Sequence, residues 1–434
     1  MENSEDRHIE INVPVLARVE GEGALDLTIR DGAIERLQLR IYEPPRLFEK
    51  LLEGREFQEV PDIVARICGI CPVAYQMSAV HALEAILGID PGPWVRAMRR
   101  VIYCGEWLES HGLHIHLLAL PDFLGYADAP AMARDYPQEV RRGLRLQGLG
   151  NRLIKLFGGR SVHPVGVRVG GFHHAPAPDA VEDMLEALRG AVEEAEALVR
   201  WVAKLPFPAD EQRFTHVSLR HPHEYPMNEG HLATSDGLAI AVEAFDDYIA
   251  EHQVPHSTAL HALLNGQPYL VGPLARLNLN LDRLPQGVRA VLNETGIAFP
   301  SRNMFHSIVA RAVEMLYAVT EAARVLQDYR SPDAPYRAAA PRAGTGYGCT
   351  EAPRGLLWHR YQCDGRGRIT SARIVPPTSQ NQARIEQDLQ TGLQAMGLDR
   401  PEQALRHYSE AVIRNYDPCI SCSTHFLKLS IDRR

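Results

Sequence analysis

Two long stretches of the chain carry apolar residues at every third or fourth position. Residues 179–205 place acidic side chains opposite the apolar ones, and residues 303–329 repeat the same spacing. This is the period of an amphipathic α-helix, so we predict two long helices that each turn one face towards a core. Similar spacing predicts helices over residues 75–87, about 94–118 and 402–415, and a short helix ending before Gly54.

Elsewhere apolar and polar residues alternate, which is typical of half-buried β-strands. Within residues 9–41, Leu25, Leu27 and Ile29 alternate with polar residues, and Asp31 and Gly32 supply a tight turn before a returning strand. A second hairpin is predicted over residues 356–374, with its turn at 364–365. Residues 206–300 contain proline, glycine and histidine and are predicted to form a mixed α/β insertion.

These elements favour one unit spanning residues 1–434 over separable domains, since we find no internal repeat, low-complexity tract or flexible linker. The predicted fold is mainly α with β insertions (α+β), with a long-helix core flanked by small antiparallel sheets.

Composition narrows the function classes. The formal net charge of −8 argues against a nucleic-acid-binding surface, where a basic face is expected. No run of 18 apolar residues occurs, so no membrane span is predicted. The first residues are acidic and polar without an apolar signal core, and we expect a cytoplasmic protein.

Four of the seven cysteines form two Cys-x-x-Cys motifs at opposite ends of the chain. Cys68 and Cys71 make the first motif, and Cys419 and Cys422 make the second, followed three residues later by His425. The other three are scattered, and we expect them to be buried free thiols: Cys104, Cys349 and Cys363. An odd number of cysteines without a dense framework fits a reducing compartment.

Two such motifs can bring four thiolates to one centre, and soft thiolates select nickel, zinc, copper(I) or iron. A structural zinc site is one interpretation, although its pairs usually lie about 15–20 residues apart. A redox-active dithiol is another, although that motif normally opens a helix in a short βαβ unit. Spacing alone leaves these alternatives open. If both motifs bind one metal centre, the two ends of the chain must meet in the fold.

The residues around the cysteines resemble the first and last metal-binding motifs of the nickel–iron hydrogenase large (catalytic) subunit. These are Arg-Ile-Cys-Gly-Ile-Cys at 66–71 and Asp-Pro-Cys-Ile-Ser-Cys-Ser-Thr-His at 417–425. Further matching motifs occur in the family's order along nearly the whole chain: residues 18–21, 163–164 with 170–171, 351–355, and 375–378 with Asn381. The resemblance implies the family's long-helix fold and reversible cleavage of H2 to protons and electrons.

The resemblance also implies a ligand set. By motif position, Cys68 and Cys419 are terminal nickel ligands, and Cys71 and Cys422 bridge nickel to iron. In the family that iron also carries one carbon monoxide and two cyanide ligands. A magnesium ion is expected near the C-terminal histidine, and its matching positions are Glu49, the backbone carbonyl of Ile374, and His425.

Five further residues receive roles from their motifs. Glu20 matches the family's proton-relay glutamate, and the Cys419 thiolate can be the first proton acceptor. Arg354 would place a guanidinium near the metals, paired with Asp417. Pro353, Arg354 and Thr378 are expected to contact the cofactor, with the Thr378 hydroxyl donating to a cyanide.

Some positions depart from the commonest family pattern. Tyr75 replaces a frequent histidine, Ser110 stands where some members have an aspartate, and Glu22 replaces a common histidine. These variants resemble the cytoplasmic multimeric branch, whose members include sulfhydrogenase-like alpha subunits. That branch couples hydrogen to NAD, NADP or another soluble carrier.

The chain has cysteines for only one metal centre, so a partner protein must carry the electrons away from it. The resemblance implies an iron–sulfur small subunit and diaphorase-like NAD(P)-binding subunits, and no Gly-x-Gly-x-x-Gly follows a strand here. It also implies nickel-insertion factors and an endopeptidase that removes residues 426–434. The competing interpretation is a structural or sensory protein with a four-cysteine zinc site.

Overall fold

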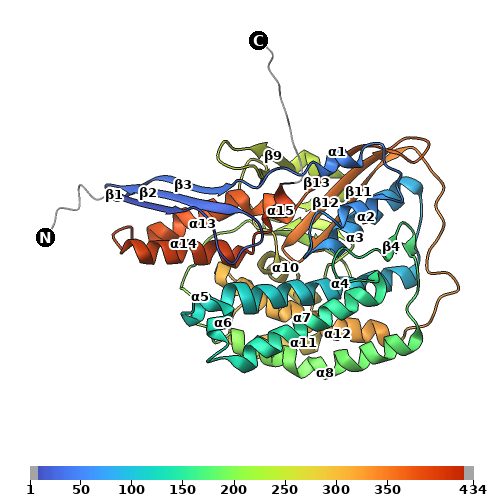
Figure 1. Cartoon of the computed structure of the whole chain (residues 1–434), viewed down its shortest axis with the longest axis horizontal. Coiled ribbons are helices and arrows are strands. Elements are labelled where there is room, and N and C mark those ends of the chain that lie inside the picture. The colour runs from blue at the N-terminus through green and yellow to red at the C-terminus, as the bar shows by residue number, and fades with distance from the viewer. Residues whose placement is uncertain (1–7, 425–434) are drawn as a thin grey trace, which may run out of the picture.

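The four longest helices form a bundle on one side of the molecule (Figure 1). The computed structural model describes residues 8–424. The bundle contains α4 (Pro93–Leu113), α7 (Pro137–Gly158), α8 (Pro178–Val202) and α12 (Ser307–Gln327). α4 packs on α7 and α12, and α12 packs on α8. Their apolar faces join one hydrophobic core that also includes the four motif cysteines.

Glycines allow α4 and α7 to approach closely. A Cβ added to Gly150 would lie 2.5 Å from the carbonyl oxygen of Gly105, and one added to Gly105 would lie 2.8 Å from Leu153 Cβ. Because no ordinary contact is that short, side chains at these positions would push the helices apart. Gly150 and the other glycines of α7 lower its helix propensity, which explains why α7 was not predicted from the sequence.

Other predicted helices are present with shifted ends. The helix predicted over 75–87 is α3 (Pro72–Leu87), and that over 402–415 is α14 (Glu402–Tyr416). The helix predicted over 94–118 is α4, which ends at Leu113 and continues as a π-helical turn, η2 (His114–Ala119), into α5 (Leu120–Leu124). α13 (Pro377–Met396) was missed because its buried face is largely polar and includes Ser379, Gln380 and Gln382.

The predicted N-terminal hairpin is confirmed. β2 (Gly23–Arg30) and β3 (Ala33–Ile41) are antiparallel, and β1 (His8–Val13) adds to the other edge of β2. Asp31 and Gly32 form the turn with φ of 50° and 74°. α1 (Phe48–Leu52) is the predicted short helix, and α2 (Val60–Val64) follows it.

The second predicted hairpin is also confirmed and has one strand more than expected. β12 (Gly355–Cys363) pairs with β13 (Ile369–Val375), and β11 (Gly344–Ala352) pairs with the other edge of β12. Ala352 is opposite Gly355, so only Pro353 and Arg354 form the turn between β11 and β12. The turn therefore fixes Arg354 at the tip of a rigid hairpin.

Residues 206–300 contain both strands and helices. The segment contains one three-stranded sheet, one two-stranded sheet and short helices: β6 (Val217–Arg220), β7 (His231–Thr234), β8 (Ala239–Ile240), η3 (Val242–Ala244), α9 (Phe245–Tyr248), β9 (Ile249–Gln253), β10 (Leu260–Leu264), α10 (Pro273–Asn280), η4 (Leu281–Arg283) and α11 (Gln286–Glu294). The remaining short elements are α6 (Ala129–Met132), β4 (Val167–Arg168), β5 (Gly171–Phe172), η5 (Met304–His306) and α15 (Ile420–Ser423).

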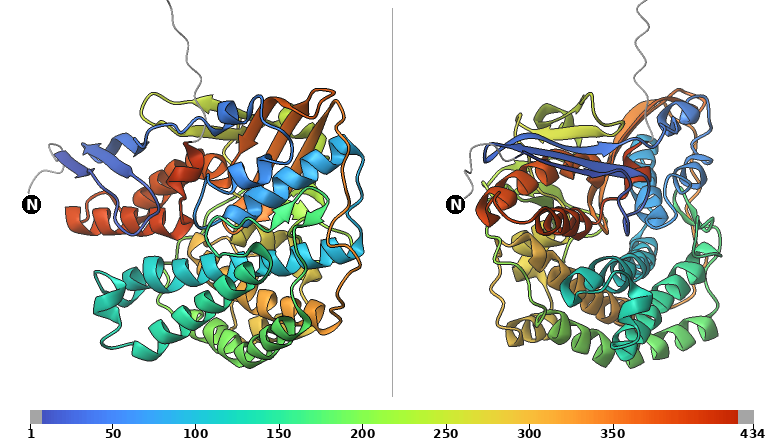
Figure 2. Two further views of the ribbon diagram at one scale, coloured as in Figure 1. Left: turned by 45° about the vertical axis from the view of Figure 1, so that its right-hand side comes forward. Right: turned by 60° about the vertical axis from the view of Figure 1, so that its left-hand side comes forward.

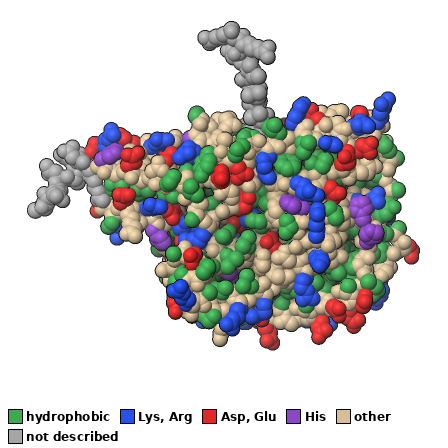
Figure 3. Space-filling model, in the orientation of Figure 1, with side chains coloured by type: hydrophobic (Ala, Val, Ile, Leu, Met, Phe, Trp, Pro, Cys, Tyr) green, Lys and Arg blue, Asp and Glu red, His purple; other side chains and the backbone are tan. Residues whose placement is uncertain are grey.

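The sheets lie above the helical bundle, and α3 and α15 meet between these layers (Figures 1 and 2). The chain ends are thereby brought together, as the split cysteine motifs require. Acidic and basic side chains are interspersed over the face in Figure 3, without a continuous basic patch there. None of the described helices combines the length and the hydropathy needed to cross a bilayer.

Candidate metal centre

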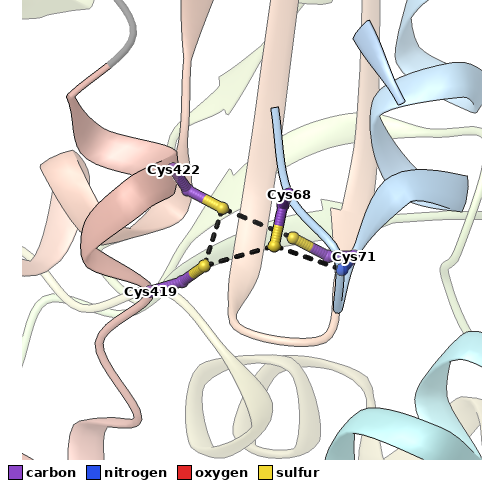
Figure 4. A group of neighbouring side chains, drawn as sticks. All are labelled: Cys68, Cys71, Cys419 and Cys422. Atoms are coloured by element: carbon purple, nitrogen blue, oxygen red, sulfur yellow. Dashed lines mark hydrogen bonds between the residues drawn. The ribbon is translucent and has the colours of Figure 1, made fainter. Parts of the chain in front are cut away.

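The four motif cysteines converge between the two ends of the chain (Figure 4). Cys71 precedes the first turn of α3, and Cys419 precedes the first turn of α15. The second motif is delivered by α14, and the residue that follows this helix, Asp417, has a left-handed backbone (φ 56°). All four sulfurs lie within 4.8 Å of one another, and all four residues are buried.

The sulfur separations suit thiolates that share metal ions. The Sγ atoms of Cys68 and Cys419 are 3.4 Å apart, those of Cys71 and Cys422 are 3.5 Å apart, and those of Cys419 and Cys422 are 2.8 Å apart. A disulfide would require about 2.05 Å, and none of the seven cysteines forms one.

The thiols are electrostatically coupled. Hydrogen bonds from Cys419, Cys422 and Cys71 hold the pKa of Cys68 well below its usual value. The backbone N–H groups of Ile70 and Cys71 also point at Cys68 Sγ, at 3.3 and 3.4 Å. Burial and the neighbouring thiols raise the pKa of Cys419 well above its usual value. Four thiolates this close together would repel one another, so they would require bound cations.

Arg354 and Asp417 form a buried ion pair beside the sulfurs. Arg354 Nη2 donates to Asp417 Oδ1 at 3.0 Å, and its Nε donates to the Asp417 carbonyl at 2.8 Å. Burial opposes the guanidinium charge, but Asp417, Cys419 and Cys71 raise the pKa of Arg354 well above its usual value. Arg354 Nη1 also lies 3.4 Å from Ser110 Oγ. These hydrogen bonds hold the positively charged Arg354 guanidinium, at the tip of the β11–β12 hairpin, beside the cysteine cluster.

Pro353 and Thr378 hold the surrounding backbone. The Pro353 carbonyl accepts a 3.0 Å hydrogen bond from the buried Arg276 guanidinium, which braces the hairpin turn. Thr378, in the first turn of α13, accepts a 3.1 Å hydrogen bond from the Cys419 N–H at its hydroxyl oxygen. This acceptor role leaves the Thr378 hydroxyl proton for another partner.

Glu20 lies against the second cysteine motif. Its backbone pairs with Cys419 in an isolated parallel bridge, and its carbonyl accepts from Ile420 N at 3.0 Å. Its carboxylate accepts from Ser421 N at 3.1 Å. Burial and the Cys68 charge raise the pKa of Glu20, while hydrogen bonds from Ser421 and Cys419 lower it. Glu20 is therefore a carboxyl group in contact with the cluster.

The predicted magnesium positions are partly described. Glu49, on α1, accepts a 2.7 Å hydrogen bond from Ile374 N on β13, so these two residues are neighbours. Burial raises the pKa of Glu49 to about 7, against lowering contributions from Ile374 and Arg373. A carboxylate in this setting would be favoured by a nearby cation. His425, the third predicted position, lies outside the described residues.

The structure adds groups that sequence reasoning missed. Glu106, on α4, accepts hydrogen bonds from Val73 N (2.5 Å) and Ala74 N (3.0 Å) in the first turn of α3. Burial raises the pKa of Glu109 to about 8 and the neighbouring Arg354 lowers it. Both carboxylates sit on a helix whose polar residues suggest an exposed face, and no sequence signal marked them as buried. The three remaining cysteines are buried and unpaired, as predicted.

Tyr75, the departure noted after the first motif, faces the same cluster. It is 1% exposed. Burial raises the pKa of its hydroxyl well above the usual value, and the Cys422 and Cys71 sulfurs raise it further. A neutral hydroxyl therefore stands beside the sulfurs of Cys71 and Cys422.

Comparisons with known proteins agree with this geometry. The family model for nickel-dependent hydrogenase matches residues 46–142 and 260–425, which include both cysteine motifs. The chain is 33% identical to sulfhydrogenase 1 subunit alpha of Pyrococcus furiosus over 426 residues, covering 97% of this chain and 99% of that protein. It is 32% identical to sulfhydrogenase 2 subunit alpha of the same organism over 427 residues, covering 96% and 100%.

A solved structure leads to the same family. An NAD+-reducing NiFe hydrogenase in the H2-reduced state superposes with a TM-score of 0.89 at 28% identity, covering 96% of this chain and 99% of that one. The predicted fold class is thereby confirmed. The chain belongs to the nickel-dependent hydrogenase family and is an oxidoreductase that acts on hydrogen.

Proposed function

We propose that the four cysteines divide their roles between nickel and iron. Cys68 and Cys419 bind nickel alone, and Cys71 and Cys422 bridge nickel to an iron that carries one carbon monoxide and two cyanides. The observation that supports this most is the convergence of four buried sulfurs at separations of 2.8–3.5 Å in three pairs. When bound, the two metals supply the two-electron chemistry of H2 ⇌ 2H+ + 2e−.

The residues around the sulfurs would stabilise charge and carry protons. The Arg354 guanidinium is held by two hydrogen bonds to Asp417, so it presents a fixed positive charge beside the centre. Thr378 has a hydroxyl proton to donate to a cyanide nitrogen, and Pro353 positions the Arg354 turn. The position of Thr378 beside the Cys419 N–H and that of Pro353 next to Arg354 support these two roles.

Glu20 would carry the proton away from the centre. The Cys419 thiolate accepts it first, and the hydrogen bond between Cys419 and the Glu20 carboxyl passes it on. Glu20 is partly exposed, unlike the sulfurs, so it has a route to solvent.

A magnesium ion would bind at Glu49, the Ile374 carbonyl and His425, with water completing its octahedron. The contact between Glu49 and Ile374 N places the first two residues together and supports this proposal. The cation would also keep the Glu49 carboxylate ionised.

Electrons would leave through an iron–sulfur small subunit, because the described residues hold a single cysteine cluster. The surface near the first motif is suited to this partner. Val162 (51% exposed) and Val165 (39% exposed) are large apolar side chains in the loop beside Gly69. Diaphorase-like subunits would then pass electrons to NAD(P), as the similarity to the solved NAD+-reducing hydrogenase suggests.

Maturation would end with removal of residues 426–434 by an endopeptidase after nickel-insertion factors have acted in the cytoplasm. A chain continuing past an inward-folded His425 would have to leave the core again. Intact-mass measurement of active enzyme tests this, since a chain still ending at Arg434 with full nickel would contradict it.

Infrared spectroscopy of the assembled enzyme tests the proposed centre. We expect one carbon monoxide and two cyanide stretching bands together with H2-dependent dye reduction. A preparation that holds zinc alone, without these bands, would support the four-cysteine zinc interpretation instead.

A further inference from the structure

A second group of metal-ligating side chains lies between the β9–β10 hairpin and α13, on residues that the hydrogen chemistry does not use. One ring nitrogen of His256, one of His261 and a carboxylate oxygen of Glu386 all lie within 4.8 Å of one another. His256 is in the loop between β9 and β10, His261 is on β10, and Glu386 is on α13. α13 packs against both β10 and β3, so the three side chains come from elements that are fixed together.

Two of the three residues are already connected, and the third lacks a partner. His256 Nε2 and Glu386 Oε1 are 2.8 Å apart, and the same oxygen accepts from Leu39 N at 2.9 Å. His261 is only 2% exposed, and its Nε2 makes no hydrogen bond among the described residues. Buried polar atoms almost always have a partner, so this nitrogen indicates a missing one.

The charge state of His261 suits a metal ligand. Burial, with the neighbouring His256 and His252, lowers its pKa to about 3. The ring is therefore neutral at neutral pH, and neutral imidazole is the form that binds metals. Burial raises the pKa of Glu386, and a bound cation would keep that carboxylate ionised.

We propose that His256, His261 and Glu386 bind one divalent transition-metal ion of the zinc class. Two imidazoles and one carboxylate are a borderline donor set. Magnesium and calcium prefer oxygen ligands alone, and copper(I) prefers sulfur, so Zn²⁺ and its first-row neighbours fit best. Three protein ligands leave a position for water.

The site has a path from solvent. His256 lines a surface pocket of about 460 Å³ together with Arg40, Tyr42 and Thr258. An ion can therefore reach the half-buried His256 from solvent without opening the core.

A metal ion bound at His256, His261 and Glu386 would stabilise the backbone behind the second cysteine motif. Thr258 N donates to the Ile41 carbonyl at 2.8 Å. Ala259 and Ile41 pack on Ile420, the residue after Cys419, in one small buried cluster. A metal that joins the hairpin to α13 would hold this wall in place, so the ion is assigned a structural role.

The test uses the assembled, nickel-loaded enzyme with its partner subunits. After equilibration with Zn²⁺ and gel filtration, zinc per large chain is measured by plasma mass spectrometry in the wild type, Glu386→Gln and His256→Gln. We expect one additional zinc in the wild type. We expect each variant to bind zinc more than about 100-fold more weakly, since loss of a group that only hydrogen-bonds a metal ligand already costs about 10–100-fold.

The matched control is His223→Gln, which changes an exposed histidine outside the cluster and should retain zinc as the wild type does. X-ray absorption at the zinc edge should show nitrogen and oxygen neighbours at about 2.0–2.2 Å and no sulfur at about 2.3 Å. Equal zinc retention in the wild type and in both cluster variants, or sulfur ligation of the added zinc, would overturn the proposal. His256 is only half-buried, so its variant keeps the test decisive if Glu386→Gln folds poorly.

Discussion

Glu20→Gln separates proton transfer from the structural role of the same side chain. The Glu20 carboxylate accepts hydrogen bonds from Ser421 N at 3.1 Å and from Cys419, and a glutamine carbonyl can accept in its place. Exchanging a charged acceptor for a neutral one costs about 1 kcal/mol. In a protein of this size that lowers Tm by no more than about 2 °C. The fold and the metal content should therefore survive.

The effect on turnover should be far larger. An amide cannot take the proton that the proposed path passes from Cys419, and a positioned general base contributes about 10²–10⁴-fold. This corresponds to about 3–5 kcal/mol on the barrier. The assays are H2-dependent dye reduction and exchange of D2 with solvent protons, with nickel content measured on the same samples. Both rates should fall together while nickel stays constant.

Glu22→Gln is the matched control, because the same change is made two residues away on an exposed side chain. It should leave both rates unchanged. A Glu20→Gln enzyme with full nickel and a rate within about tenfold of wild type would refute the assignment. Glu109, whose pKa is raised to about 8 beside Arg354, would then be the next proton carrier to examine.

Three further outcomes follow from the geometry. Cys419→Ser should abolish nickel retention because an alkoxide is a poor substitute for a thiolate. Cys104→Ser should retain nickel, and loss of nickel in that variant would disprove the ligand set. Arg354→Lys keeps the charge but loses the two-point hold on Asp417, so dye reduction should fall about 10²-fold at constant nickel, and an unchanged rate would remove Arg354 from the proposal. Val162→Glu should reduce co-purification of the small subunit without loss of nickel, and undiminished pull-down would place the interface elsewhere.

The sequence predicted the elements whose pattern is local. The long helices α8 and α12 have a clear apolar period, and the Asp31–Gly32 turn has the residues that a hairpin needs. The cysteine convergence also followed, because four thiols in two motifs have to meet in order to act together. These inferences depend on spacing that the chain itself displays.

Other features depend on tertiary packing. α7 contains glycines that weaken its helical pattern but are required by its contact with α4, and α13 buries polar side chains that hide its period. Only the two-residue turn between β11 and β12 explains how Arg354 reaches the cluster. The buried Glu106 and the half-buried Glu109 gave no sequence signal, since burial of a carboxylate is decided by what packs over it.

The most direct test of the central claim is X-ray absorption at the nickel edge of the assembled enzyme. The account predicts one nickel per chain with four sulfur neighbours, from Cys68, Cys71, Cys419 and Cys422. It also predicts that this signal disappears in Cys419→Ser together with H2-dependent dye reduction. Zinc in place of nickel, or nickel without sulfur neighbours in an active enzyme, would contradict it.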